Sequence, residues 1–171
     1  MNKIVCSMLL IFLFLPPLAA QEPAAGESAE LSSPAAGIPK MSAGLLLEAN
    51  ANTREGVSFG GGLRFDYLVL DFLAVGTQVS VSSDFAELVT LEPSALVRWY
   101  VPVLGGDGKG LFVQGNLGAS LIFEEGELTP AILGGLAAGY RFVFGSWFVE
   151  PFGRGGYPFL WGAGVSAGLR F

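Results

Sequence analysis

The last eleven residues alternate strictly between two kinds of side chain. A period of two is that of a β-strand whose faces meet different environments. One face carries the apolar set, Trp161, Ala163, Val165, Ala167, Leu169 and Phe171, and the other carries Gly162, Gly164, Ser166, Gly168 and Arg170. The sequence therefore predicts a terminal strand with bulky apolar residues on one side and small or charged residues on the other.

The same alternation recurs seven times upstream. The predicted strands are Ala43–Ala51, Val57–Tyr67, Leu73–Ser82, Leu91–Val101, Leu111–Glu124, Ile132–Phe144 and Trp147–Tyr157. Turn-forming residues separate them at Asn52–Gly56, Leu68–Asp71, Asp84–Glu87, Pro102–Gly110, Glu125–Glu127, Gly145–Ser146 and Pro158–Leu160. Eight strands with short connections predict an all-β, antiparallel, up-and-down arrangement. Pro93 and Pro151 lie inside strands and lack an N–H, so we expect bulges or local breaks there.

The distribution of arginine decides which face points inward. Five arginines fall on the small-residue face, and each would cost about 2–4 kcal/mol against lipid near a bilayer midplane. These are Arg64, Arg98, Arg141, Arg154 and Arg170. Their summed cost would exceed ordinary folding stability, whereas a soluble barrel would put the bulky face inside. We therefore expect residues 41–171 to form an eight-stranded transmembrane β-barrel with the arginines in its lumen.

Aromatic residues of the apolar face sort toward the two ends of the predicted strands, as girdles at membrane interfaces do. One set is Phe65, Tyr67, Trp99, Phe142, Phe144, Trp147 and Phe171, and the other is Phe59, Phe123, Tyr157 and Trp161. If the chain enters from the periplasm, the first set lies at the periplasmic end.

The predicted lumen carries charges of both signs. They are Glu48, Arg64, Asp66, Glu92, Arg98, Arg141, Glu150, Arg154 and Arg170. Paired charges would form a closed plug, and rearranged pairs would instead give a narrow, gated polar pore. Six apolar residues also point inward in this register, so a conduit for hydrophobic molecules is a further alternative. They are Leu46, Leu96, Ile122, Leu133, Phe148 and Phe152.

The N-terminus has the pattern of a secretory signal peptide. Lys3 precedes the apolar run Ile4–Leu15, and Pro16–Ala20 ends it with small residues before Gln21. We predict a signal peptide over residues 1–20 and a flexible periplasmic leader over residues 21–40, whose Ala, Ser, Pro, Gly and Glu content disfavours a packed core. An uncleaved anchor is the alternative at the first segment, and a binding tail at the second.

The residue types that the sequence lacks exclude several kinds of catalysis and metal binding. Histidine is absent and Cys6, the one cysteine, lies in the predicted signal peptide, which removes imidazole and thiol catalysis and metal sites built on them. We expect no enzyme activity, no cofactor and no metal. Gly105–Gly110 contains Lys109 but lacks the Ser or Thr and the helix of a phosphate loop. The chain has 9 basic and 15 acidic residues, which argues against nucleic acid as a partner.

Together, the signal pattern, the alternating strands and the closing Val165, Ala167, Leu169 and Phe171 resemble the small outer-membrane barrels of the OmpA, OmpX and OmpW type. The resemblance implies a bacterial outer-membrane location, outer-membrane lipid around the barrel, and a C-terminal signal read by the barrel-assembly machinery. It favours a monomeric, non-enzymatic structural or surface component with a periplasmic N-terminus. A porin-like pore, an OmpW-like conduit and a host- or ligand-binding role remain alternatives, the last resting on the acidic tip Glu124–Glu127.

Overall fold

A computed structural model describes residues 39–52, 56–86, 88–124 and 127–171. The predicted signal peptide and nearly all of the predicted leader lie outside these residues. The regular elements are eight strands, β1 (Met41–Asn52), β2 (Gly56–Leu70), β3 (Leu73–Ser83), β4 (Val89–Gly106), β5 (Lys109–Glu124), β6 (Glu127–Phe144), β7 (Trp147–Tyr157) and β8 (Trp161–Arg170). The described part contains no helix long and apolar enough to cross a membrane.

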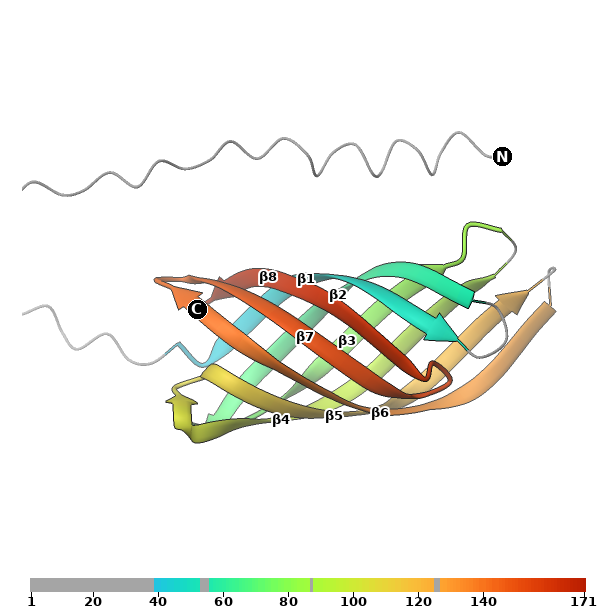
Figure 1. Ribbon diagram of the computed structural model, residues 1–171. Coiled ribbons are helices and arrows are strands. Elements are labelled where there is room, and N and C mark those ends of the chain that lie inside the picture. Colours follow the sequence, from blue (N-terminus) through green and yellow to red (C-terminus); the bar gives the residue numbers. More distant parts are fainter. Residues whose placement is uncertain (1–38, 53–55, 87, 125–126) are drawn as a thin grey trace, which may run out of the picture. The chain divides into compact units, whose positions relative to one another are not determined.

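The strands form one closed barrel in sequence order (Figure 1). Every strand is antiparallel to its neighbours, and β8 returns to β1 through a register from Ser42 opposite Arg170 to Ala51 opposite Trp161. This confirms the predicted all-β, eight-stranded, up-and-down barrel. We call the end at which β1 begins and β8 ends the terminal end, and the opposite end the loop end.

Alternation along each strand sets the two surfaces of the barrel wall. In β4, Leu96, Arg98 and Tyr100 are buried, whereas the intervening Val97 and Trp99 are exposed. The interior therefore holds the polar and charged side chains, and the outer surface holds the bulky apolar ones, as the sequence predicts. A small apolar core of Leu68, Ala74, Tyr100 and Phe112 fills the terminal end. Leu88 and Phe159 are buried at the loop end.

Three strand boundaries differ from the prediction by more than two residues. β2 continues to Leu70, β6 begins at Glu127, and β4 continues to Gly106 through the segment assigned to a turn. The β4–β5 connection shrinks to Asp107 and Gly108, both at positive φ (54° and 69°). Two consecutive left-handed residues are what a tight hairpin turn between twisted strands requires, and Asp-Gly supplies them cheaply. The Gly-rich composition of Pro102–Gly110 therefore misled the prediction, because only its last part turns.

Pro93 and Pro151 produce local breaks and no bulge. The β4–β5 pairing omits Glu92 and Pro93 but resumes at Ser94 in the same register. The β6–β7 pairing likewise omits Glu150 and Pro151, again with the register unchanged. On their other sides, Pro93 pairs with Val79 and Pro151 with Val165. Each proline thus removes hydrogen bonds toward one neighbour only.

Candidate functional site

The structure places the side chains of all nine predicted luminal charges in the barrel interior. Eight of these residues are buried, and the side chain of Arg154 is 16% exposed. They do not form one continuous network. They divide into two clusters, which we call the Glu150 cluster (Arg64, Asp66, Arg98, Arg141 and Glu150) and the Arg154 cluster (Glu48, Glu92 and Arg154), with Arg170 separate.

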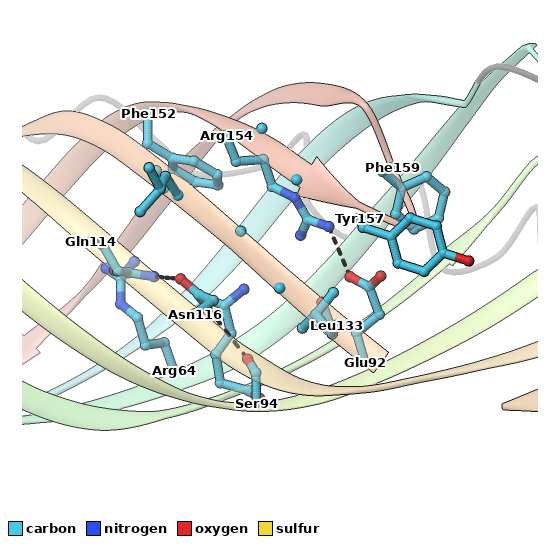
Figure 2. A pocket seen from close by; sticks show the side chains of 18 of the residues that line it. Arg64, Glu92, Ser94, Gln114, Asn116, Leu133, Phe152, Arg154, Tyr157 and Phe159 are labelled. Atoms are coloured by element: carbon cyan, nitrogen blue, oxygen red, sulfur yellow. Dashed lines mark hydrogen bonds and ion pairs between the residues drawn. The ribbon is translucent and has the colours of Figure 1, made fainter. Parts of the chain in front are cut away.

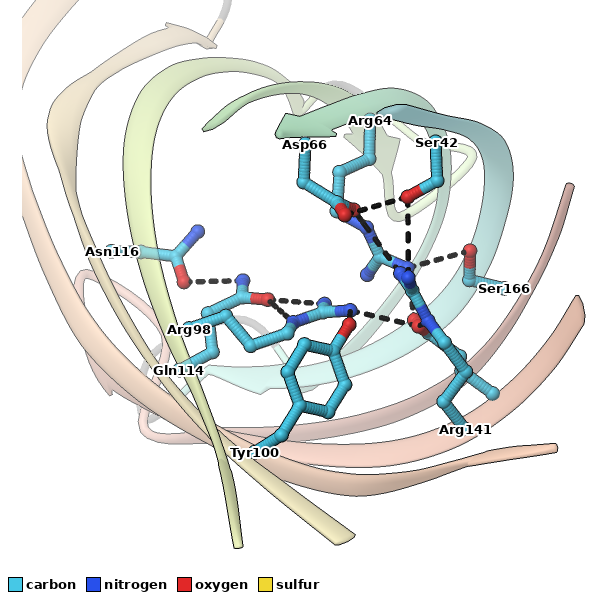
Figure 3. A network of polar contacts seen from close by, with 10 residues as sticks. Ser42, Arg64, Asp66, Arg98, Tyr100, Gln114, Asn116, Arg141 and Ser166 are labelled. Atoms are coloured by element: carbon cyan, nitrogen blue, oxygen red, sulfur yellow. Dashed lines mark hydrogen bonds and ion pairs between the residues drawn. The ribbon is translucent and has the colours of Figure 1, made fainter. Parts of the chain in front are cut away.

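Glu150 is the hub of its cluster. Its Oε1 accepts hydrogen bonds from Arg98 Nη1 at 2.7 Å and from Arg141 Nε, and its Oε2 accepts one from Arg64 Nη2. These three arginines come from β2, β4 and β6 and converge on one carboxylate of β7 (Figure 3). One acidic group thus ties together four strands around the barrel wall.

Asp66 is the second acid of the cluster. It accepts hydrogen bonds from Arg141 Nη2 at 3.1 Å and from Ser42 Oγ at 2.6 Å, and its Oδ2 lies 3.6 Å from Arg64 Nε. Ser42 is on β1, so the hydrogen bonds also reach the strand that closes the barrel. Ser166 of β8 accepts a hydrogen bond from Arg64. The cluster therefore spans the β1–β8 seam as well as the opposite wall.

Uncharged side chains surround this cluster, and of the aromatic ones only Phe148 was predicted to point inward. Gln114 accepts from Nε and Nη2 of Arg98. Arg98 lies 4.0 Å from the centroid of the Phe112 ring, and Arg141 lies 4.3 Å from that of Phe148, at cation–π distance. Tyr100 and Phe112 fall on the inner face by the alternation of their strands. They were not predicted there because they are large, whereas the predicted inner face carries small or charged residues.

The Arg154 cluster lies nearer the loop end. Arg154 Nη1 donates to both oxygens of Glu48, at 3.1 and 3.2 Å, and Nη2 donates to Glu92 at 2.9 Å. Asn50 supports Glu48 with a 3.0 Å hydrogen bond. One arginine of β7 thereby joins carboxylates from β1 and β4.

Arg170 takes a different partner. Its Nη2 donates to the backbone oxygen of Asp107 at 2.5 Å, in the β4–β5 turn. Arg170 thus links the last strand to a turn at the terminal end of the barrel and joins neither cluster.

The interior has little free volume. The cavity beside the Arg154 cluster measures about 30 Å³ and is lined by polar groups such as Ser80, Glu92, Asn116 and Arg154 (Figure 2). One water needs roughly 10–15 Å³ measured this way, so about two fit. Ser80 Oγ lines the cavity and is buried without a hydrogen-bond partner among the described residues, as expected of a group that bonds to water.

The inward apolar residues fill space. Leu46, Leu96, Leu133 and Phe148 are buried, and Ile122 and Phe152 are partly buried. Together with the charge clusters they leave no lumen for an organic molecule in the described part of the barrel.

Two other predicted features can be located. Val165, Ala167, Leu169 and Phe171, the predicted assembly signal, are all exposed on the outer face at β8 and its end. Among the described residues there is no group of three or more His, Cys, Asp or Glu side chains that could hold a metal ion.

Comparison with known proteins gives a likeness in structure. No family model matches the sequence, and no curated protein matches it. A de novo designed transmembrane β-barrel superposes with a TM-score of 0.50 at 17% identity, covering 75% of this chain and 95% of the design. The N-terminal β-barrel domain of OprF from Pseudomonas aeruginosa gives a TM-score of 0.50 at 17% identity, covering 76% of this chain and 97% of that domain. The fold is that of the small OmpA-type outer-membrane β-barrels.

Proposed function

We propose that this protein is an integral component of a bacterial outer membrane, with a structural or surface role and a closed, charge-filled lumen. The observation that carries the proposal is the combination of an exposed apolar band with an interior of paired charges. Ile132 is 73% exposed and Leu117 is 68% exposed. An apolar surface that encircles a protein is a liability in water and is expected in a bilayer.

Aromatic side chains support a membrane position. All eleven residues of the two predicted girdles are exposed. At the terminal end, Tyr67 pairs with Met41, and Trp147 pairs with both Phe144 and Leu169. At the loop end, Trp161 pairs with Ala51, and Phe123 pairs with Val89 and Leu128. Rings of aromatic residues at both ends of an apolar band suit the two membrane interfaces.

The closed lumen favours a structural role over transport. A cavity of about 30 Å³ admits water but not an organic solute. A hydrophobic conduit of the OmpW kind would need the apolar residues of the lumen to line a passage, and they are packed instead. A narrow pore remains the second candidate because the Arg154 cluster borders that cavity, which is large enough for water.

An absence of enzyme activity belongs to the same proposal. The sequence has no histidine, and the two carboxylates of the Glu150 cluster are held by arginines. These carboxylates are hydrogen-bonded in structural pairs and not presented to a substrate pocket. We further propose a periplasmic N-terminus, insertion by the barrel-assembly machinery through the C-terminal strand, and a monomeric state.

The first experiment tests the membrane barrel. We expect the protein to require detergent for extraction and to migrate differently on gels before and after heating, since closed barrels resist unfolding by unheated dodecyl sulfate. A mature protein that stays soluble without detergent would contradict the proposal.

The second experiment separates the plug from the pore. We expect no conductance in planar bilayers at any voltage for the wild-type protein. Glu92→Ala and Arg98→Ala test the two clusters separately, because Glu92 borders the cavity and Arg98 does not. Discrete wild-type openings that change with Glu92→Ala would establish the pore instead.

A further inference from the structure

A second interior cavity lies at the terminal end of the barrel. It measures about 10 Å³, which is space for one water molecule or for one oxygen of an anion. Three of the four charged residues that line it are cations, namely Lys40, Arg141 and Arg170, and the fourth is Asp66. We call it the terminal cavity. Positive charge therefore predominates around it.

Asp66 cannot balance all three cations. Its carboxylate accepts a hydrogen bond from Arg141 Nη2 at 3.1 Å, and its Oδ2 lies 3.6 Å from Arg64 Nε (Figure 3). One carboxylate thus already serves two arginines of the Glu150 cluster. Little of its charge is left to compensate Arg170 or Lys40.

Arg170 and Lys40 have no partner of opposite charge among the described residues. Arg170 is buried and donates a hydrogen bond to the backbone oxygen of Asp107 at 2.5 Å. No described carboxylate, including that of Asp107, lies within 4.0 Å of either cation. A buried charge without a counter-charge is unfavourable. The terminal cavity therefore attracts an anion.

The register of the β1–β8 seam directs both cations inward. Arg170 pairs with Ser42 across the seam, and both residues are buried. Lys40 precedes Ser42 by two residues and so falls on the same face of the chain. Its backbone oxygen accepts a hydrogen bond from the N–H of Leu68, a buried residue, at 2.6 Å. The backbone at Lys40 is therefore held by the barrel, although its side chain is exposed.

We propose that the terminal cavity binds a phosphate anion, with one oxygen inside the cavity near Arg141 and Arg170 and the others toward Lys40. A guanidinium group presents a fork of N–H donors that matches phosphate, and an ammonium group adds a point charge. The cavity admits one oxygen and no organic group, so the rest of the anion lies in the mouth of the barrel. This inference goes beyond the proposed structural role and requires only a folded barrel.

Soluble phosphate reaches the terminal cavity more readily than a lipid head group does. Ser42, Asp66 and Arg141 line the cavity and are buried inside the barrel, so the wall separates them from the apolar outer face. Lys40 is exposed and directly precedes β1. A phosphate that enters from the water at the terminal end therefore meets Lys40 first.

Isothermal titration calorimetry provides the test. The protein is folded in an uncharged detergent at low ionic strength, which limits screening, and is titrated with inorganic phosphate. We expect saturable binding of one phosphate per barrel. Arg170→Gln should lower the affinity about tenfold, and Lys40→Gln should lower it severalfold. Lys109→Gln removes an exposed lysine at the same end that does not line the cavity. It is the matched control and should bind as the wild type does.

Heat-dependent gel migration of every variant confirms that the barrel has folded. If Arg170→Gln does not fold, Lys40→Gln and Lys109→Gln decide, because both change exposed residues. No binding by the folded wild type, or equal losses in these two lysine variants, would overturn the proposal and leave the proposed function standing.

A second titration identifies the source of the phosphate. The barrel is placed in phospholipid nanodiscs, which leave both of its ends open to the solution. We expect inorganic phosphate to bind there as it does in detergent. Loss of binding in the nanodiscs would assign the cations to lipid head groups and would overturn the assignment to soluble phosphate.

Discussion

Arg98 Nη1 lies 2.7 Å from Glu150 Oε1, and both side chains are fully shielded from solvent. Arg64 and Arg141 bond to the same carboxylate from other strands. A buried charge is tolerated only while its partners remain. Arg98 pairs with Glu150 alone among the described carboxylates, and Arg64 and Arg141 share Glu150 with Asp66. Glu150 is therefore the residue whose loss would leave the most buried charge unpaired.

Replacing Glu150 with glutamine should destabilise the barrel strongly. The amide keeps the shape but removes the charge, and breaking a buried ion pair costs about 3–5 kcal/mol. Urea unfolding in vesicles, followed by tryptophan fluorescence, measures the loss. Glu127→Gln, at an exposed residue of β6, is the control and should change little. Equal midpoints for the two variants would show that the Glu150 cluster does not stabilise the barrel.

Removing Arg154 should destabilise the barrel less than Glu150→Gln does, and a second substitution should recover part of the lost stability. Arg154→Ala leaves Glu48 and Glu92 without their shared cation, and hydrogen bonds to charged groups contribute about 1.5–3 kcal/mol. Adding Glu92→Gln removes one of the two stranded charges and should recover part of the stability. The free energies of unfolding of the two single variants and the double variant measure this coupling. Simple additivity would mean that the three side chains act independently.

A charged side chain on the apolar band should destabilise the barrel more than a charged side chain outside the band. Leu63, 63% exposed, lies in the middle of β2, and Val103, 91% exposed, lies beyond Trp99 on β4 near the terminal turn. In vesicles, Leu63→Arg should lower the free energy of unfolding by about 2–4 kcal/mol, and Val103→Arg should lower it by less than about 1 kcal/mol. Comparable losses at both positions would argue that the band does not contact lipid.

The predicted assembly signal can be separated from stability. The Phe171 side chain is exposed, while its backbone N and O each bond to Met41 at 2.9 Å. Phe171→Ser keeps these backbone bonds, so we expect a nearly unchanged unfolding midpoint in vitro. In cells we expect less folded barrel in the outer membrane, measured by unheated gel migration of membrane fractions. Val149→Ser, at an exposed residue of β7, is the control. Normal assembly of the Phe171 variant would remove this residue from the signal.

The number of strands, their order and the inward face of each could be predicted from the residues alone. This prediction was possible because the side-chain period of a strand is two and because arginine is costly against lipid. Trp147–Tyr157 even has the predicted limits. The ends of the strands were harder to predict. In Pro102–Gly110, for example, glycine is compatible both with a strand that passes close to its neighbour and with a turn.

Which charges meet could not be predicted from the sequence. Glu150 and Arg64 are 86 residues apart, and nothing local in the sequence couples them. Their contact follows from barrel closure and register, which also divide the predicted network into two clusters and turn Arg170 toward a backbone oxygen. Tyr100 and Phe112 became part of the interior because aromatic rings pack against arginines in a barrel too narrow to stay empty.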